Sequence, residues 1–282
     1  MRLAAACTAI AQLSMWVPAS ALADPPRAAD QHFTIDPVSD IVLTGSGAGI
    51  TVLLSMILGT GEIRPSPLSP GDENKLLGID KWAVNQTIDP NADTYSNVGL
   101  YTAVAFAVID PLLSGLRDGW DAALVDGVMY AESISLTEAL TDITKIAVRR
   151  PRPLDYIQCE RSTSGSCSST DVELSFFSGH AATVASITGT ATYLAFIRSP
   201  DSWRPWVTLA AGSLLTGFVD YERVRAGAHF PTDVIAGTFA GGAVGVLVPH
   251  LHRHQQEAPA VWVGAAPGPG GNGAMITAGG AF

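Results

Sequence analysis

Three short segments of the sequence gather basic side chains and histidines beside residues that end or begin helices. The first runs from Lys145 to Pro153. Pro151 should end a helix near Arg150, and the prolines on both sides of Arg152 should hold that side chain on a stiff, extended segment. An ammonium and a planar guanidinium can grip one tetrahedral anion from different sides. The segment therefore indicates an anion site, although a solvated basic helix end would have the same sequence.

The second segment, SFFSGH at residues 175–180, precedes an apolar helical stretch. Ser178 stands where an N-cap is needed, and Gly179 lets the backbone approach a ligand, so free N–H groups would face an oxyanion. His180 would lie beside that anion, where its pKa near neutrality suits a proton donor to a departing alkoxide. A single histidine after a cap is more often structural, so this segment alone does not establish a function.

The third segment runs from Arg223 to Asp233 and contains His229. Pro231 suits the first position of a helix, so Asp233 would lie in the first turn and could reach back to the ring of His229. A carboxylate on one ring nitrogen fixes the tautomer and leaves the other nitrogen as a nucleophile. The alternative is that Asp233 only caps its own helix.

Together the three segments resemble the signature motifs of the type 2 phosphatidic acid phosphatase and vanadium haloperoxidase superfamily: K-x6-R-P, P-S-G-H and S-R-x5-H-x3-D. The resemblance runs from about residue 96 to 250. It implies that His229 is a nucleophile that forms a phosphohistidine and that Asp233 orients it. It also implies that His180 protonates the leaving group and later activates water. The groups that would hold the phosphoryl oxygens are Lys145, Arg152, Arg223 and the backbone at Ser178 and Gly179.

Two positions depart from these motifs. Phe177 replaces the proline, which removes a rigid entry into the helix and could loosen the loop. Glu222 replaces the serine before Arg223. An acid there would either orient Arg223 by pairing or repel an anionic substrate, and the sequence leaves both open. Arg149, Arg150 and Arg225 match no motif position, so they would shape the entrance or be solvated.

The resemblance predicts a phosphatase that hydrolyses a phosphate monoester, a lipid phosphate or a diphosphate. Three cations and a helix terminus can neutralise the charge on a phosphoryl group, so we expect no metal or other cofactor. One alternative is a haloperoxidase, in which the same residues grip vanadate and His229 coordinates it. The other is a catalytically inactive envelope binding protein, in which Phe177 and Glu222 have abolished catalysis at the site.

The whole chain is acidic and carries few charges. Its 282 residues are 47% hydrophobic and 15% charged, with 26 acidic against 16 basic residues and a net charge of -10. The apolar content excludes a disordered chain, and the negative charge argues against nucleic acid as a partner. A local basic cluster would have to hold an anionic substrate against this global field. The sequence does not fix the oligomeric state.

The amino terminus and the cysteines predict export. Residues 1–23 have a basic start at Arg2, an apolar stretch and an A-x-A pattern at their end, which are typical of a signal peptide. We therefore expect the chain in the periplasm or cell envelope. Cys159 and Cys167 flank a polar run and predict a disulfide that closes a small loop, as an oxidising compartment allows.

The remaining pattern is helical, with no convincing alternation of period two. We expect one all-α domain, a bundle of about six core helices. Residues 24–95 would be a helical extension, 96–254 the phosphatase core and 255–282 a Gly-rich tail that is either a short β-hairpin or disordered. The expected helical stretches are 41–58, 73–87, 96–116, 120–150, 179–198, 204–221 and 232–250.

Three uncharged runs bear on membrane insertion. They cover 41–58, 181–197 and 234–248 and are shorter than the about 20 residues of an untilted span. Several acidic residues in 120–150 also disfavour contact with lipid. We therefore expect a soluble or peripheral protein, with an integral one as the alternative. Gly237, Gly241 and Gly245 permit close helix approach in either case.

Of His250, His252 and His254 only the first and last share a helix face, so we expect no functional metal there.

Overall fold

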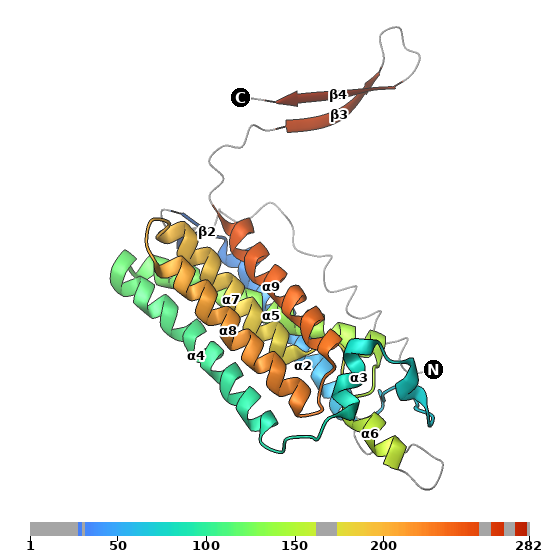
Figure 1. The fold of residues 1–282 in the computed structure, drawn as a ribbon. Helices are drawn as coiled ribbons and strands as arrows, with labels where there is room; N and C mark the ends of the chain where they lie inside the picture. The colour runs from blue at the N-terminus through green and yellow to red at the C-terminus, as the bar shows by residue number, and fades with distance from the viewer. Residues whose placement is uncertain (1–27, 30–31, 162–173, 254–260, 268–273, 281–282) are drawn as a thin grey trace.

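The computed structural model describes residues 28–29, 32–161, 174–253, 261–267 and 274–280. The predicted signal peptide at residues 1–23 lies outside the described residues, and so does Cys167. The described part is almost entirely helical, so the expected all-α bundle is confirmed. Its six long helices run roughly side by side in Figure 1: α2 (Pro37–Gly59), α4 (Ala92–Asp118), α5 (Trp120–Val148), α7 (Gly179–Arg198), α8 (Arg204–Arg225) and α9 (Pro231–His252).

Helix α7 is the central element and packs on α4, α5, α8 and α9. Its sequence is dominated by alanine, threonine and glycine, so neighbouring helices can approach it from all sides. Helix α2 lies on the outside and packs mainly on α5. The apolar core of the bundle lies where α4, α5 and α7 meet, around Val125, Met129, Val184 and Leu194.

Three glycines of α9, predicted to allow close helix approach, lie against the backbone of α7. A methyl group at Gly241 would come within 1.9 Å of the carbonyl oxygen of Ala182, and one at Gly245 within 2.1 Å of that of Ser186. Gly237 is similarly placed, one turn nearer the start of α9. Because any side chain there would push the helices apart, these glycines set the spacing of α7 and α9.

Short helices cover one end of the bundle, toward the lower right of Figure 1. They are the 3-10 turn η1 (Asp72–Lys75), α3 (Gly78–Asn85) and α6 (Pro153–Arg161). The sequence did not predict α6, because two nearby prolines indicated an extended segment. Pro153 instead occupies the first helical position, and the carboxylate of Asp155 accepts the backbone N–H of Arg152 at 2.8 Å. This is half of a capping box, which starts a helix directly after Arg152.

Two small antiparallel hairpins complete the described chain. The first joins β1 (Ala28–Ala29) to β2 (Thr34–Ile35). The second joins β3 (Val261–Pro267) to β4 (Ala274–Gly280), in a register that pairs the first residue of β3 with the last of β4. Of the two alternatives for the tail, the structure therefore has the hairpin.

Three helices are long and apolar enough to cross a membrane: α2, α4 and α9. They contain 23, 27 and 22 residues, which is roughly 33–40 Å of helix at 1.5 Å per residue, more than the about 30 Å hydrocarbon core of a bilayer. Little of α2 is buried inside the bundle, and large apolar side chains are exposed along it. The expectation of a soluble or peripheral protein is therefore wrong, and these helices point to an integral membrane protein.

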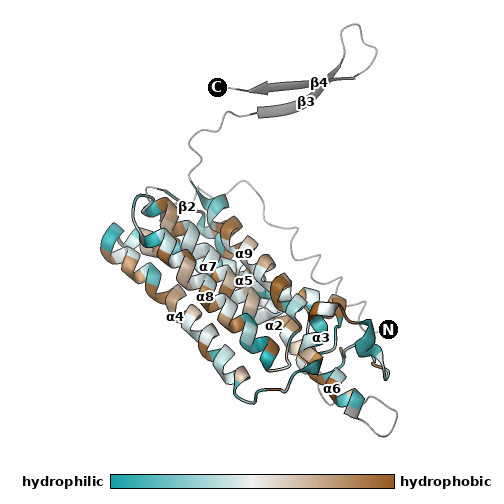
Figure 2. Ribbon diagram, viewed as in Figure 1, coloured by the Kyte–Doolittle hydropathy of each residue, from teal (hydrophilic) through white to brown (hydrophobic). Residues whose placement is uncertain are grey.

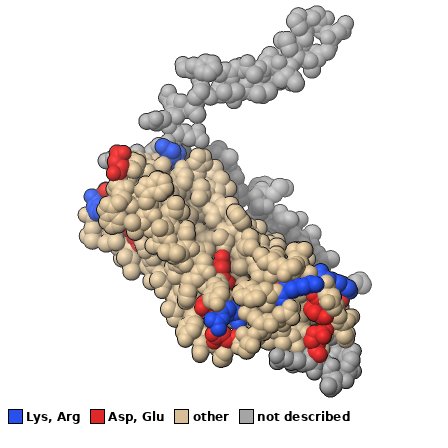
Figure 3. All heavy atoms as spheres, in the orientation of Figure 1, with Lys and Arg blue, Asp and Glu red and all other residues tan. Residues whose placement is uncertain are grey.

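The surface of the bundle agrees with this correction. On the face drawn in Figure 3, most charged side chains gather toward the two ends of the bundle, with an uncharged surface between them. Figure 2 shows apolar residues along α4, α8 and α9, and each of these helices has large apolar side chains that are exposed. A helix that is apolar on its outer side needs either a further protein layer or lipid around it.

Candidate active site

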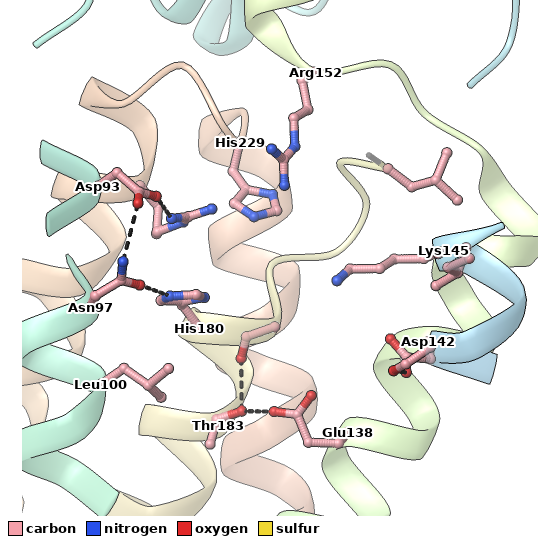
Figure 4. A pocket seen from close by; sticks show the side chains of 16 residues that line it. Asp93, Asn97, Leu100, Glu138, Asp142, Lys145, Arg152, His180, Thr183 and His229 are labelled. Carbon is pink, nitrogen blue, oxygen red and sulfur yellow. Dashed lines mark hydrogen bonds and ion pairs between the residues drawn. The ribbon is translucent and has the colours of Figure 1, made fainter. Parts of the chain in front are cut away.

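A cavity of about 660 Å³ lies at the end of the bundle near the short helices. Six of the eight catalytic and phosphate-binding residues predicted from the sequence line this cavity, including Gly179 at the start of α7. Figure 4 shows the side chains of Lys145, Arg152, His180 and His229 around this space. The residues that line it are Ser55, Leu58, Gly59, Asp93, Asn97, Leu100, Glu138, Asp142, Lys145, Arg152, Leu174, Gly179, His180, Thr183, Arg223 and His229.

His229 precedes α9 and is almost fully buried. Its Nδ1 lies 2.7 Å from the backbone carbonyl oxygen of Ser175. Because a carbonyl can only accept, Nδ1 carries the proton and Nε2 keeps its lone pair. Burial, and then the positive charges of Arg223, Arg152 and Lys145, lower the pKa of His229 well below its usual value. The ring is therefore neutral near pH 7, as a nucleophile must be.

Asp233 contacts His229 less directly than the sequence predicts. Its Oδ2 lies 3.9 Å from Nδ1 of His229, too far for a hydrogen bond. The carboxylate instead accepts the hydroxyl of Ser175 and, at 2.8 Å, the backbone N–H of Phe230. Asp233 thus holds the two segments on either side of the histidine, and the carbonyl of Ser175 orients the ring.

Behind Asp233 lies Arg150, which matches no motif position. Its guanidinium donates to Asp233 and, at 2.7 Å, to Asp80 of α3. Asp80 also accepts the backbone N–H and the hydroxyl of Thr232 at 3.1 and 2.8 Å. The guanidinium lies 4.0 Å from the ring centroid of Phe230. Arg150 is therefore neither solvated nor at the entrance, and it ties α3 to the first turn of α9.

A second chain of contacts links the other histidine to α4. Nε2 of His180 lies 2.7 Å from Oδ1 of Asn97, and the amide of Asn97 donates to Asp93 at 3.1 Å. Asp93 also accepts a hydrogen bond from Arg223 of α8. Because the oxygen of Asn97 only accepts, Nε2 of His180 carries a proton and Nδ1 is the ring nitrogen left to titrate. The contacts of Asp93 thus hold His180 and Arg223 in one unit. Figure 4 shows the part of this chain that runs from His180 through Asn97 to Asp93.

The start of α7 presents fewer free backbone donors than expected. Ser178 is the N-cap of α7, as predicted, with its hydroxyl 3.4 Å from the backbone N of Ala181. However, its own N–H donates to the carbonyl of Asp233 at 3.2 Å, so it is not available to a phosphoryl oxygen. Gly179 lines the cavity and lies close to Lys145, whose Nζ is 3.8 Å from where a Cβ on this glycine would stand. The backbone contribution to an anion site therefore begins at Gly179.

Acidic side chains also line the cavity on the α5 side. Asp142 accepts the hydroxyl of Ser55 of α2 at 3.0 Å, and Glu138 accepts that of Thr183 of α7. Both lie within two turns of Lys145 on the same helix. The cations of the site therefore face both a space for an anion and carboxylates that hold the surrounding helices together.

The two departures from the motifs lie in packed surroundings. Phe177 is buried, and its ring packs edge-on against Phe176, with the centroids 6.1 Å apart. Glu222 is buried and lies outside the cavity lining, while Arg223 pairs with Asp93 of α4. The sequence left open whether Glu222 pairs with Arg223. In the structure Arg223 of α8 pairs with Asp93 of α4 instead. Cys159 of α6 is disulfide-bonded, and its expected partner Cys167 lies outside the described residues.

Comparison with protein families gives one match. Residues 126–257 match the model of the PAP2 superfamily. The matched range contains every motif position from Lys145 to Asp233, so the resemblance drawn from the sequence is confirmed and supports phosphatase chemistry in general.

One similar solved structure is the crystal structure of the first transmembrane PAP2 type phosphatidylglycerolphosphate phosphatase from Bacillus subtilis. The two chains are 19% identical with a TM-score of 0.47, and the match covers 73% of this chain and 94% of the other. A comparison with curated protein sequences gave no significant match.

Four residues of the candidate site were not predicted from the sequence. Asp93 and Asn97 are four residues apart at the start of an apolar helix, a spacing that places both on one face and could have marked them. Asp80 had no such signal, because its partners lie about 70 and 150 positions away. Arg150 was weighed only as an entrance or solvated residue.

Proposed function

We propose that this protein is a membrane-embedded phosphatase that releases inorganic phosphate from a lipid phosphate through a phosphohistidine at His229, without a metal ion. The observation that carries the proposal is the convergence of two histidines and three cations on one cavity. They come from α5, α7, α8 and the segments before α6 and α9, and span positions 145–229 of the chain. Because these residues come from five separate segments of the chain, chance alone does not account for their convergence on one cavity.

The first chemical step is attack on phosphorus by Nε2 of His229. The P–N bond forms and the ester P–O bond breaks, while protonated His180 gives its Nδ1 proton to the departing oxygen. Burial and the charge of Arg223 lower the pKa of His180 to about 4 in the free site. A bound dianionic phosphate raises this pKa, because a nearby negative charge favours the imidazolium. The hydrogen bond from Nδ1 of His229 to Ser175 keeps the attacking nitrogen aimed at the cavity.

The second step regenerates the histidine. Neutral His180 takes a proton from water, the hydroxide attacks phosphorus, and the P–N bond breaks to return the neutral ring of His229 and release phosphate. Lys145, Arg152 and Arg223 line the same cavity and stabilise the charge spread over the three equatorial oxygens in both steps. In other phosphoryl-transfer sites a divalent metal stabilises this negative charge, and here the three side chains would do so.

A lipid substrate is supported by the helices that line the cavity. Leu58 comes from α2 and Leu100 from α4, two of the candidate membrane spans. A phosphate held by the three cations would therefore lie next to helices that contact acyl chains. The leaving group could remain in the bilayer while only the phosphate is drawn into the site.

The test is phosphate release by the detergent-solubilised full chain in excess chelator, with phosphatidic acid and a water-soluble phosphate ester as substrates. We expect the wild type to prefer the lipid and His229→Ala to lose at least about a thousandfold, because the nucleophile is absent. His250→Ala is the matched control, since His250 contacts Tyr193 instead of the cavity and should keep full activity.

Trapping with labelled substrate separates the mechanism from the activity. We expect an acid-labile phosphoenzyme in the wild type and none in His229→Ala. Equal release by the two proteins would contradict the phosphohistidine mechanism. Halide oxidation by the vanadate-loaded protein, without phosphate release, would favour the haloperoxidase alternative.

A further inference from the structure

A second cluster of ionisable side chains lies at the opposite end of the bundle from the cavity. Asp40 is in the first turn of α2, Glu132 is in α5 and His252 is the last residue of α9. One oxygen of each carboxylate and Nε2 of the histidine all lie within 4.8 Å of one another. Because α9 begins beside His229, its length places this cluster roughly 30 Å from the catalytic histidine.

The ring of His252 is oriented as that of a metal ligand. Its Nδ1 lies 2.8 Å from the backbone carbonyl oxygen of Val248. A carbonyl only accepts, so Nδ1 donates to it, and Nε2 faces the two carboxylates. The proton that Nε2 donates to Asp40 at 3.2 Å would leave when a metal ion binds. An N–H donated to a carbonyl by one ring nitrogen, with the metal on the other, is the usual arrangement of a metal-bound histidine.

Both carboxylates are buried and face the same histidine. Glu132 is 3% exposed, and its buried Oε2 has no hydrogen-bond partner among the described residues. This oxygen lies 3.5 Å from Nε2 of His252. Asp40 is 5% exposed, and its Oδ2 accepts only the backbone N–H of Asp36, at 2.9 Å. In the described part of the chain, no lysine or arginine pairs with either carboxylate.

The spacing of the three ligand atoms fits a small divalent cation. Nε2 of His252 is 3.2 Å from Oδ1 of Asp40 and 3.5 Å from Oε2 of Glu132. Bonds of about 2.0–2.1 Å to a tetrahedral zinc ion put neighbouring ligand atoms about 3.3 Å apart. Two carboxylates and a neutral imidazole also balance a charge of +2, whereas a protonated histidine would leave a net charge of -1 in a buried site.

We propose that Asp40, Glu132 and His252 bind one Zn²⁺ ion, with a fourth position open to water or another ligand. The ion would join the start of α2, the middle of α5 and the end of α9. Nearby, Phe33 of the first hairpin region bridges to Arg253, so the site lies where the amino-terminal segment closes over the bundle. The role of the ion is structural, because it would hold three helices together roughly 30 Å from the catalytic histidine.

The test measures zinc binding by the untagged full chain in detergent. After chelator treatment, the protein is equilibrated with Zn²⁺, freed of unbound metal and assayed for zinc per chain. We expect about one ion in the wild type and at least a tenfold weaker affinity in Glu132→Gln, which keeps the size of the side chain. His250→Ala is the matched control, because that histidine is also near the end of α9 but faces Tyr193.

Cobalt substitution reports the geometry independently. We expect the visible bands of tetrahedral Co²⁺ in the wild type and in His250→Ala, and their loss in Glu132→Gln and Asp40→Asn. Helical circular dichroism and a single peak in size exclusion identify variants that have kept their fold. Zinc retained by folded Glu132→Gln, or lost in His250→Ala, would mean that exposed histidines bind it adventitiously and would overturn the proposal. So would a wild type without zinc, whose cluster would then be a protonated His252 paired with the two acids.

Discussion

At the scale of single residues, Arg150 holds two buried carboxylates together behind the histidine of the site. Asp80 and Asp233 are both fully buried, and Arg150 pairs with each. Removing one partner of a buried ion pair costs about 3–5 kcal/mol, because the charge left behind has no compensation. We expect Arg150→Gln to lower the free energy of unfolding by about that amount. Activity should also fall, because Asp233 positions Ser175, whose carbonyl holds His229.

The measurement is thermal unfolding in detergent together with kcat and KM. Arg149→Gln is the control, since Arg149 is exposed and its side chain donates to the carbonyl of Ile146 on its own helix. It should change neither quantity. A loss of activity in Arg150→Gln through KM alone would contradict the positioning role, because a displaced nucleophile lowers kcat.

The limits of sequence interpretation are clearest at this same scale. His229, His180 and the three cations could be found because their motifs are short and each sits beside a proline, a glycine or a helix start. From the sequence, Asp233 could be predicted only to approach the ring of His229. In the structure the backbone carbonyl of Ser175, in a different segment 54 positions from His229, makes the hydrogen bond to that ring instead. Contacts of this kind depend on how α3, α7 and α9 pack, which no local pattern encodes.

At the scale of helices, the position of α9 on α7 sets the geometry of the site. Local signals predicted α7 at 179–198, as found, because Ser178 caps it and its apolar run is uninterrupted. The glycine spacing of α9 predicted that another helix packs closely against it, but not that this helix is α7. Gly241 lies against the carbonyl of Ala182, four residues after Ser178, so a shift of α9 there would move both histidines relative to each other.

We therefore expect Gly241→Ala to destabilise the protein and to reduce activity. The added methyl group would stand 1.9 Å from the carbonyl oxygen of Ala182, which is backbone and cannot rotate away. Overpacking of this kind typically costs about 1–3 kcal/mol. Gly242→Ala is a closely matched control, because its methyl group would meet nothing within 4 Å and alanine favours a helix. Equal melting temperatures for the two variants would contradict the close approach of α7 and α9.

At the scale of the whole molecule, the sequence analysis misjudged the relation to the membrane because it counted only uncharged runs. Helix α4 was not among the three runs weighed, and it contains Asp110 in its second half. In the structure Asp110 faces inward, where Tyr130 and Arg204 donate to it at 3.0 and 2.9 Å. A charge that is paired inside the bundle does not prevent the outer side of the helix from contacting lipid. The length of the helix and its outer surface are therefore better guides than the absence of charge.

The outer side of α2 allows this conclusion to be tested. Val52 lies in its apolar span and is 54% exposed, so in a membrane its side chain would contact acyl chains. A short carboxylate cannot reach the headgroups from there, and its insertion near the centre of a span costs about 2.5–3.5 kcal/mol. We expect Val52→Asp to reduce severalfold the protein that stays in the membrane pellet after an alkaline carbonate wash. Leu77→Asp is the control, because Leu77 is 63% exposed and precedes α3 outside the spans, where an aspartate can cap the helix. If carbonate released the wild type, or if both variants stayed in the pellet equally, α2 would not lie in the bilayer.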